Sequence, residues 1–236
     1  LLPTEALSAF NSVDRINYMD DESKIKIGYM DRPSPIGFNQ TITAPHMHSY
    51  AVKMLLSKLN EGSSVLDVGC GSGYLTAIFG HMVGVHHNKG NVVGIDIYDE
   101  IVNKSISNIK KSNPNLIVSD RIKIVKSDGW FGYPAKENKP LYDCIHIGAR
   151  TEKLPIYLWN QLKEGGLILL PLGDEYQTKM TLYFKPYNCG EYGYCYNEKY
   201  LNVRFVPLQH LEPAVEPQVE PAVEPQVEPA VEPQVE

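Results

Sequence analysis

The sequence predicts a doubly wound α/β fold, in which a mostly parallel β-sheet is covered by helices and ends in an antiparallel edge. Between residues 64 and 171, five apolar segments rich in Val, Ile and Leu alternate with segments of helical periodicity. Strands of nearly continuous apolar character are typical of a parallel sheet that is buried on both faces. A Gly-x-Gly-x-Gly turn follows the first of these strands, and two further strand-like segments follow the last helix.

The elements ahead of the first strand are expected to be short. Apolar residues recur at helical spacing over residues 5–19, which predicts one or two short helices packed beside the main domain. Prolines and glycines within residues 20–45 exclude a long regular element there. A helix is expected to begin at Pro45, because the first turn of a helix tolerates a residue without an N–H group.

Strands and helices alternate in the rest of the chain. The predicted strands of the parallel part are Ser64–Val68, Asn91–Asp96, Ile122–Lys126, Asp143–Ile147 and Leu167–Pro171. The predicted helices between them are Gly73–Gly84, Asp99–Lys111 and Leu154–Leu162. The antiparallel edge is expected from Met180–Lys185 and Leu201–Val206, which are separated by a loop rich in Tyr and Gly.

The C-terminal residues form a repeat of different composition. Residues 212–235 are three copies of Glu-Pro-Ala-Val-Glu-Pro-Gln-Val, and Glu236 closes the series. A segment with a proline at every fourth position, no aromatic residue and high charge is typical of a disordered, partly polyproline-II arm. We therefore expect one domain over residues 1–211 and a disordered tail over 212–236, with either a passive or a partner-binding role.

Composition excludes several classes of function. The tail contains seven of the 28 acidic residues and no basic one, so the remainder is nearly neutral, with 22 basic and 21 acidic residues. This balance gives no electrostatic basis for binding nucleic acid. No run of 18 apolar residues is present, so no membrane span is expected. Four scattered cysteines and no signal pattern indicate a cytoplasmic protein.

The glycine turn predicts a nucleotide or nucleoside site. Gly69, Gly71 and Gly73 are one residue more closely spaced than the G-x-G-x-x-G fingerprint that holds a pyrophosphate at a helix N-terminus. This difference favours a nucleoside ligand without a pyrophosphate, and S-adenosylmethionine is the leading candidate. A tight strand-to-helix turn without a ligand is the alternative.

Acidic residues at the strand ends favour an adenosine-bearing ligand over an empty turn. Ligands of such sheets lie outside the carboxyl ends of the strands, where these residues stand. Asp96 is placed to accept hydrogen bonds from both hydroxyls of a ribose. Asp128, which is followed by Gly129, is placed to accept a hydrogen bond from the amino group of an adenine. Asp96 could instead cap the next helix, and Asp128 could belong to an ordinary turn. Asp67 lies inside an apolar strand, where a charge must be hydrogen-bonded. It could orient the glycine turn, hold the amino group of the cofactor, or be purely structural.

The segment from Gly37 to His48 points to a particular family. It reads Gly-Phe-Asn-Gln-Thr-Ile-Thr-Ala-Pro-His-Met-His and lies just ahead of the glycine turn. With Val93–Asp96, Asp128-Gly129 and Tyr142–Ala149, it resembles the protein-L-isoaspartate (D-aspartate) O-methyltransferases. The resemblance runs from about Ala6 to Leu208, and it implies the S-adenosylmethionine-dependent, Rossmann-like methyltransferase fold.

The resemblance implies that a methyl group passes from S-adenosylmethionine to the free carboxylate of L-isoaspartyl and D-aspartyl residues in damaged proteins, which begins their repair. Thr43 matches the active-site hydroxyl of the family, and Gln209 stands where the family carries Thr. The candidate cofactor-binding residues are Gln40, Thr41, Ile42, Thr43, His48, Asp67, Gly69, Gly71, Ser72, Asp96, Asp128, Gly129 and Gln209.

The expected chemistry requires no general base and no metal, because a carboxylate of reference pKa about 4 is already ionised at neutral pH. Thr43 would hold this acceptor by a hydrogen bond; its alternative role is at the entry to the helix at Pro45. The pairs His46/His48 and His86/His87 have no Cys or carboxylate at ligand spacing, so no metal is expected.

The resemblance also predicts how the domain is divided. Residues 1–60 are expected to form a substrate-side extension of helices and loops, and residues 61–211 the cofactor-binding core. The family carries a further helix ahead of residues 6–19, so we expect an N-terminally truncated, monomeric enzyme that acts on isoaspartyl proteins and peptides. A methyltransferase with another carboxylate acceptor, or a non-catalytic binding module, are the alternatives.

Overall fold

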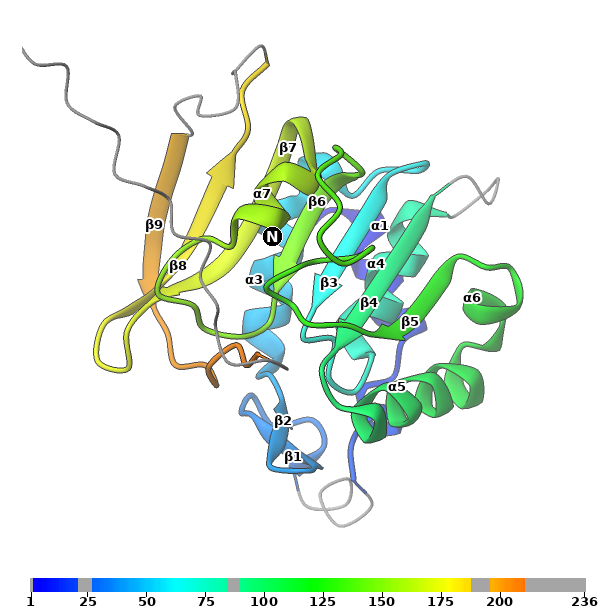
Figure 1. Cartoon of the computed structure of the whole chain (residues 1–236). Helices are drawn as coiled ribbons and strands as arrows, with labels where there is room; N and C mark the ends of the chain where they lie inside the picture. Colours follow the sequence, from blue (N-terminus) through cyan, green and yellow to red (C-terminus); the bar gives the residue numbers. More distant parts are fainter. Residues whose placement is uncertain (1, 21–26, 85–89, 188–195, 211–236) are drawn as a thin grey trace, which may run out of the picture.

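The computed structural model describes residues 2–20, 27–84, 90–187 and 196–210, and a seven-stranded sheet forms its centre (Figure 1). The strands are ordered β5-β4-β3-β6-β7-β8-β9 across the sheet. Their bounds are β3 (Ser64–Val68), β4 (Asn91–Asp96), β5 (Ile122–Lys126), β6 (Tyr142–Ile147), β7 (Leu162–Gly173), β8 (Thr178–Phe184) and β9 (Tyr196–Asn202). Strands β3 to β7 are parallel, whereas β8 and β9 are antiparallel, so the predicted antiparallel edge is confirmed.

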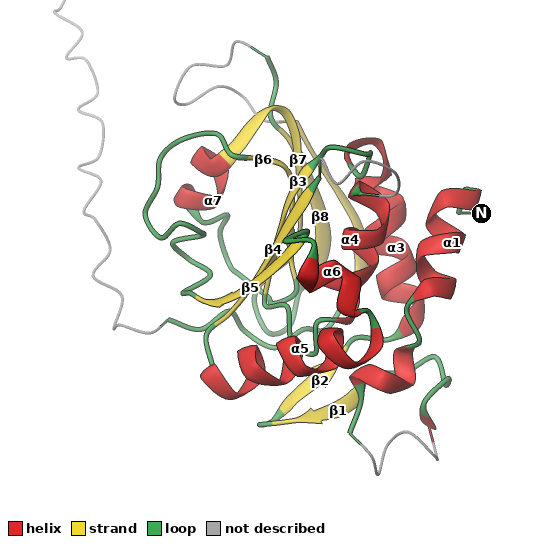
Figure 2. Cartoon of the chain, turned by 90° about the vertical axis from the view of Figure 1, so that its right-hand side faces the viewer, coloured by secondary structure: helices red, strands yellow, loops and turns green. Residues whose placement is uncertain are grey.

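The helices cover the two faces of the sheet unequally, as Figure 2 shows from the side. One face packs against α1, α3, α4, α5 and α6, whereas α7 and the loops beside it cover the other. The bounds of the helices are α1 (Thr4–Ser12), η1 (Arg15–Tyr18), α3 (Pro45–Leu55), η2 (Leu56–Lys58), α4 (Tyr74–Val83), α5 (Asp99–Ser112), α6 (Pro114–Val118) and α7 (Ile156–Gln161).

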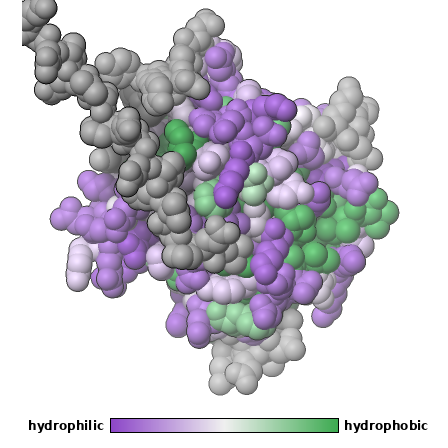
Figure 3. Space-filling view, in the orientation of Figure 1, coloured by the Kyte–Doolittle hydropathy of each residue, from purple (hydrophilic) through white to green (hydrophobic). Residues whose placement is uncertain are grey.

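Each central strand contributes to both cores, as expected for a doubly wound sheet. In β3, Val65 belongs to the core beneath α4, whereas Leu66 and Val68 belong to the core beneath α7, and all three are fully buried. The surface facing the viewer in Figure 3 is mostly hydrophilic. A hydrophobic patch lies where Figure 1 places α6, whose Val118 is 82% exposed.

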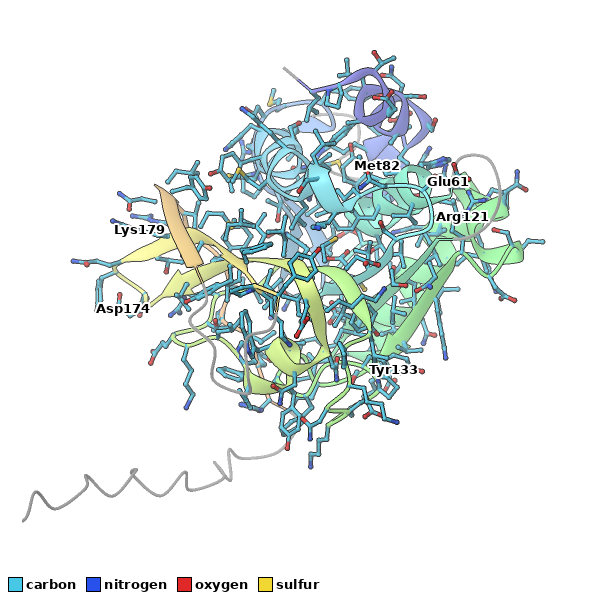
Figure 4. The ribbon with its side chains drawn as sticks, turned by 90° about the horizontal axis from the view of Figure 1, so that it is seen from above. Glu61, Met82, Arg121, Tyr133, Asp174 and Lys179 are labelled. Carbon is cyan, nitrogen blue, oxygen red and sulfur yellow. The ribbon has the colours of Figure 1, made fainter. Side chains whose placement is uncertain are left out.

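The order of the strands fixes the place of the ligand site. The chain proceeds from β3 through β4 to β5 on one side, and then crosses over to place β6 on the other side of β3. The connections after β3 and β6 therefore leave the sheet in opposite directions and open a crevice at the carboxyl ends of these two strands. The antiparallel edge lies away from this crevice. Figure 4 shows Asp174, in the β7–β8 turn, and Lys179, near the start of β8, well apart from Tyr133.

The elements before the sheet agree with their predictions. Residues 5–19 contain the two predicted short helices, α1 and η1, and a helix begins at Pro45. The stretch 20–45 contains no long element, but it holds a small hairpin formed by β1 (Ser34–Gly37) and β2 (Gln40–Ile42).

Two predicted strands were wrong in their bounds by more than two residues. Strand β7 begins at Leu162 and not at Leu167, because the preceding helix ends one residue earlier than expected and the chain enters the sheet at once. The last strand is Tyr196–Asn202 and not Leu201–Val206. This strand was missed because it is polar, and a strand at the edge of a sheet needs less apolar surface than a central one. Residues 203–206 leave the sheet, and Val206 O accepts a hydrogen bond from the N–H of Arg150 at 2.7 Å.

Helix α6 was not predicted, and Pro114 stands at its first turn. No helix in the described part of the chain is long and apolar enough to cross a membrane. The tail 212–236, the histidines at 86 and 87 and most of the predicted Tyr- and Gly-rich loop lie outside the described residues.

Candidate active site

A cleft of about 920 Å³, its open mouth included, lies at the carboxyl ends of the central strands. Its lining comes from the glycine turn, the β4–α5 connection, the segment from β2 into α3, the end of β6, the residues that follow β5 and β6, and residues 206–209. Of the candidate residues, those that line the cleft are Gln40, Thr41, Ile42, Thr43, His48, Asp67, Gly69, Gly71, Ser72, Asp96, Gly129 and Gln209. Only Asp128 is absent from the wall.

The glycine turn is fixed to the neighbouring strand. The N–H groups of Gly69 and Cys70 both donate to Ile95 O, at 2.8 and 3.0 Å. Gly71 has a φ of +54° and Gly73 a φ of +84°, a region that L side chains avoid. A Cβ at Gly73 would lie 2.4 Å from Ser105 Oγ, so this glycine serves the close packing of α5. Burial raises the pKa of the Cys70 thiol, which therefore lines the cleft as a neutral group.

Asp96 at the end of β4 joins the glycine turn to the next loop. Its carboxylate accepts the N–H of Gly71 at 3.1 Å and that of Ile97 at 2.9 Å. Burial raises the pKa of this carboxyl above its usual value, and the N–H donors oppose the change. Helix α5 has Tyr98 at its N-cap without a side-chain cap, so Asp96 is not the cap residue. A carboxylate has about four acceptor positions, which leaves capacity for a ligand hydroxyl.

Asp67 is held by two donors that the sequence did not reveal. The register between β3 and β6 sets Asp67 opposite His146, whose Nδ1 lies 2.8 Å from Asp67 Oδ1. Thr76 Oγ1, in the first turn of α4, donates to Asp67 Oδ2 at 2.5 Å. Both carboxylate oxygens are therefore bonded within the protein, which favours the expected roles of orienting the glycine turn or of a purely structural residue over that of holding the amino group of the cofactor.

Thr43 follows β2 and directly precedes the N-cap of α3, Ala44. Its carbonyl accepts a hydrogen bond from Arg15 Nη1 at 2.8 Å. The structure shows no side-chain cap at this helix, so the Thr43 hydroxyl does not serve the alternative role of capping it. Within the described residues this hydroxyl has no protein partner, and Thr43 lines the cleft. It can therefore donate to an acceptor that enters the cleft.

His48 is a neutral imidazole in the cleft wall. Burial lowers its pKa well below the usual range, and the charges of Arg15 and His146 act in the same direction. The ring is 7% exposed, lies 5.0 Å from the ring of Tyr74, and its buried Nδ1 has no partner within the described residues. Unpaired buried polar atoms are rare in folded proteins, so an unpaired nitrogen in a cleft wall points to a ligand atom.

The charges of the cleft favour a cationic ligand. Asp67 and Asp96 are the carboxylates of the wall, and none of the lining residues within the described chain is Lys or Arg. Groups of three or more His, Cys, Asp or Glu side chains able to hold a metal ion do not occur within the described residues.

Comparisons with known proteins agree with this arrangement. The profile of the family described as protein-L-isoaspartate(D-aspartate) O-methyltransferase (PCMT) matches residues 2–213. The chain belongs to this family. The resemblance based on the Gly37–His48 segment is therefore confirmed.

Two relatives illustrate how far the similarity to the isoaspartate methyltransferases extends. Protein-L-isoaspartate O-methyltransferase 2 of Arabidopsis thaliana is 41% identical over 181 residues, which are 76% of this chain and 55% of the relative. The Methanococcus maripaludis (strain C6) protein-L-isoaspartate O-methyltransferase is 36% identical over 202 residues, which are 86% of each chain. The chain thus spans about half the length of the plant relative.

A solved structure gives the same result for the fold. It comes from Plasmodium falciparum and is described as a protein-L-isoaspartate O-methyltransferase in complex with S-adenosyl-L-homocysteine. The two structures superpose with a TM-score of 0.78 at 30% sequence identity, over 89% of this chain and 92% of that one. The predicted methyltransferase fold is therefore confirmed.

The C-terminal segment of this family member closes one side of the cleft. Gln209 lines the cleft, and its side-chain oxygen accepts a hydrogen bond from the hydroxyl of Tyr98, another lining residue. Trp130 Nε1 donates to Leu208 O at 3.3 Å and holds the same segment from the other side. Gln209 therefore forms a side-chain hydrogen bond to another residue of the cleft wall.

Asp128 points away from the cleft in this structure. Its carboxylate accepts the N–H of Trp130 at 2.9 Å and lies 3.2 Å from Nδ1 of His210, which stacks on the Trp130 ring. The backbone turn that was its alternative is present, since the N–H of Phe131 donates to Asp128 O. The structure thus brings Gly129, and not the Asp128 side chain, to the cleft wall.

Proposed function

We propose that this chain is a protein repair methyltransferase that transfers a methyl group from S-adenosylmethionine to the free carboxylate of L-isoaspartyl and D-aspartyl residues. One observation carries the proposal: the hydroxyl-bearing segment Gln40–Thr43 and the glycine turn line the same cleft. The segment identifies the family, and the turn supplies a nucleoside site. Membership of the family and the related structure in complex with S-adenosyl-L-homocysteine support the same conclusion.

The residues of the cleft fit S-adenosylmethionine as the cofactor. Asp96 would accept the ribose hydroxyls, and the backbone at Gly129 would lie beside the adenine. Nδ1 of His48, which has no partner among the described residues, provides a further polar partner. The acidic wall, to which no described Lys or Arg contributes, suits a cation. When bound, S-adenosylmethionine supplies a methyl group on a positively charged sulfur.

The chain itself contributes orientation. The acceptor carboxylate, with a reference pKa of about 4, enters already ionised and needs no proton acceptor. The Thr43 hydroxyl would donate one hydrogen bond to it and fix its direction, and alignment of this kind can lower a barrier by roughly 7–11 kcal/mol. A Lys or Arg in contact with the acceptor would stabilise the charged reactant more than the transition state, in which that charge is disappearing. The absence of such a cation from the described cleft wall is consistent with this chemistry.

A paired-peptide assay tests the proposal. The protein is incubated with labelled S-adenosylmethionine and two peptides that differ only in carrying Asp or L-isoAsp at one position. Labelling of the isoAsp peptide alone, as a base-labile ester, is expected. Equal labelling of both would indicate a methyltransferase with another carboxylate acceptor. The absence of both labelling and S-adenosylhomocysteine binding would indicate a non-catalytic binding module.

We further infer the division and setting of the protein. Residues 1–60 would form the acceptor side and residues 61–211 the cofactor core, because Thr43 from the first part and the glycine turn from the second both line the cleft. The free, buried thiols of Cys70 and Cys144 suit a cytoplasmic protein. We expect a monomer, and sedimentation of the purified protein with and without S-adenosylhomocysteine checks this expectation.

A further inference from the structure

Arg15 is a buried cation outside the cleft wall. It lies in η1, its residue is 5% exposed, and burial lowers the pKa of its guanidinium. Arginine is almost never buried unless its donors are paired, because a charge loses much hydration energy on leaving water. The structure pairs this guanidinium with backbone carbonyls, and its buried Nε has no partner within the described residues. Burying this guanidinium costs hydration free energy, so its contacts with the neighbouring segments are of particular interest.

The two carbonyls that Arg15 contacts flank the β1–β2 hairpin. Nη1 donates to Thr43 O at 2.8 Å, directly after β2, and Nη2 donates to Arg32 O at 3.3 Å, just before β1. A single planar group therefore holds both ends of the hairpin that carries the family segment. The planar fork of arginine suits this task, because its donors are fixed relative to one another.

The guanidinium also lies against the first residue of α4, which follows the glycine turn. Cζ of Arg15 lies 5.7 Å from the ring centroid of Tyr74, the first residue of α4 after the turn. Tyr74 lines the cleft and contacts the ring of His48. Arg15 thus connects the base of the acceptor hairpin to the start of the helix behind the cofactor cleft.

We propose that Arg15 is a positioning residue, which holds the Thr43 hydroxyl at the correct place relative to the glycine turn without touching the acceptor carboxylate. The proposal rests on the proposed function for its kinetic consequences, but not for its structural ones. Because Arg15 acts through the Thr43 carbonyl, its charge stays behind the cleft wall, where it does not pair with the reacting carboxylate.

A purely structural role for Arg15 makes a different prediction. If Arg15 only anchored η1, any loss of an η1 contact would have the same effect. Tyr18 provides the matched control, because its hydroxyl donates to Asn113 Oδ1 at 2.7 Å and ties the same short helix to the end of α5. Tyr18→Phe removes this bond and keeps the ring. It should therefore lower stability without changing turnover.

The kinetic test compares Arg15→Met, Arg15→Lys and Tyr18→Phe with the wild-type protein. Displacement of a reacting group by about 1 Å costs roughly 100-fold in rate, so we expect Arg15→Met to lower kcat on the isoAsp peptide by about 10- to 100-fold. Calorimetric affinity for S-adenosylhomocysteine should stay nearly unchanged. Arg15→Lys keeps the charge and loses the fork, so it should restore kcat only in part. A fall in kcat no larger than that of Tyr18→Phe, or an equal loss of S-adenosylhomocysteine affinity, would overturn the proposal.

Hydrogen exchange without ligand separates this proposal from the proposed function. In Arg15→Met, the amides of residues 34–45 should exchange faster, whereas those of α4 should change little. Tyr18→Phe should leave the hairpin protected. Unchanged exchange at the hairpin in a folded Arg15→Met protein would show that Arg15 does not hold it. If instead the wild type methylates no isoAsp peptide but the hairpin loses protection, the proposed function fails and the structural role of Arg15 stands.

Discussion

His146 and Asp67 form a buried pair across two neighbouring strands, with His146 Nδ1 2.8 Å from Asp67 Oδ1 and side chains 9% and 2% exposed. The hydroxyl of Thr76, in α4, donates a hydrogen bond to the other carboxylate oxygen of Asp67. A carboxylate taken out of water remains stable only while its oxygens keep such donors. This network therefore joins β3, β6 and α4 at the wall of the cleft, which Asp67 and His146 both line, and it accounts for an acidic residue inside an apolar strand.

Replacing one donor of this network should cost stability. We expect Thr76→Val to lower the free energy of unfolding by about 1–3 kcal/mol, because it leaves a buried acceptor unsatisfied with little change of shape. Urea denaturation at neutral pH measures the change. Ser119→Ala removes an exposed hydroxyl that donates to Asn115 O and should change stability by no more than about 0.5 kcal/mol. If Thr76→Val is as stable as the control, the network does not support Asp67.

The assignment of Thr43 to the acceptor side predicts a separation of two constants. Thr43→Val should lower kcat on an isoAsp peptide by about tenfold or more, since it removes a hydrogen bond to a charged group. The affinity for S-adenosylhomocysteine should change much less. Thr43→Ser keeps the hydroxyl and serves as the control, with kcat close to that of wild type. Loss of cofactor affinity with full turnover at saturation would place Thr43 on the cofactor side instead.

Asp96 should show the reverse behaviour. Asp96→Asn removes a charged acceptor, so S-adenosylhomocysteine binding should weaken by roughly 10- to 100-fold, before any effect on saturated turnover. Burial raises the pKa of this carboxyl, so the wild-type affinity should fall as acidification protonates it, beginning at a higher pH than for an ordinary Asp. Calorimetry over a pH series checks both points. A pH dependence that persists unchanged in Asp96→Asn would contradict this assignment.

His48 predicts how stability depends on pH. Its pKa is lowered in the folded protein, chiefly by burial, so below about 6.5 the unfolded chain binds a proton that the folded chain does not. Stability should therefore fall with decreasing pH, by up to about 1.4 kcal/mol per pH unit for this group, until the pH passes the folded-state pKa. Burial also lowers the pKa of His81, which acts in the same direction.

Urea denaturation at a series of pH values measures this slope. His48→Gln should make it shallower, whereas His46→Gln, at a half-exposed residue paired with Asp31, should leave it nearly unchanged. Equal slopes for His48→Gln and wild type would show that the imidazole of His48 is not the group that resists protonation.

Sequence reasoning succeeded where the relevant signal is local. Strands β3, β4 and β5 have the predicted bounds, because each is a short apolar run bounded by turn residues. The glycine turn, Asp96 and Gly129 could be placed at the cleft because the carboxyl ends of parallel strands converge at one edge of the sheet. The residues from Gln40 to Thr43, His48 and Gln209 were listed instead from the resemblance to the family.

Features that depend on contacts between distant segments were not predicted. The pairing of His146 with Asp67 requires the register of strands 79 residues apart. Asp128 turns toward His210, 82 residues away, so its position at a strand end was an insufficient guide to its direction. The contacts of Arg15 could likewise not be predicted from the sequence, because only the folded hairpin brings its two carbonyl partners together.

The cleft is lined by segments near both ends of the described domain, because Thr43 and Gln209 both contribute to its wall. A molecule that binds there contacts early and late parts of the chain at once, and its binding energy opposes the opening of either part. Product held in the cleft should thus protect the N-terminal hairpin and the C-terminal segment from proteases together. Release of product would expose both at once, so cofactor supply would set the lifetime of the enzyme as well as its rate.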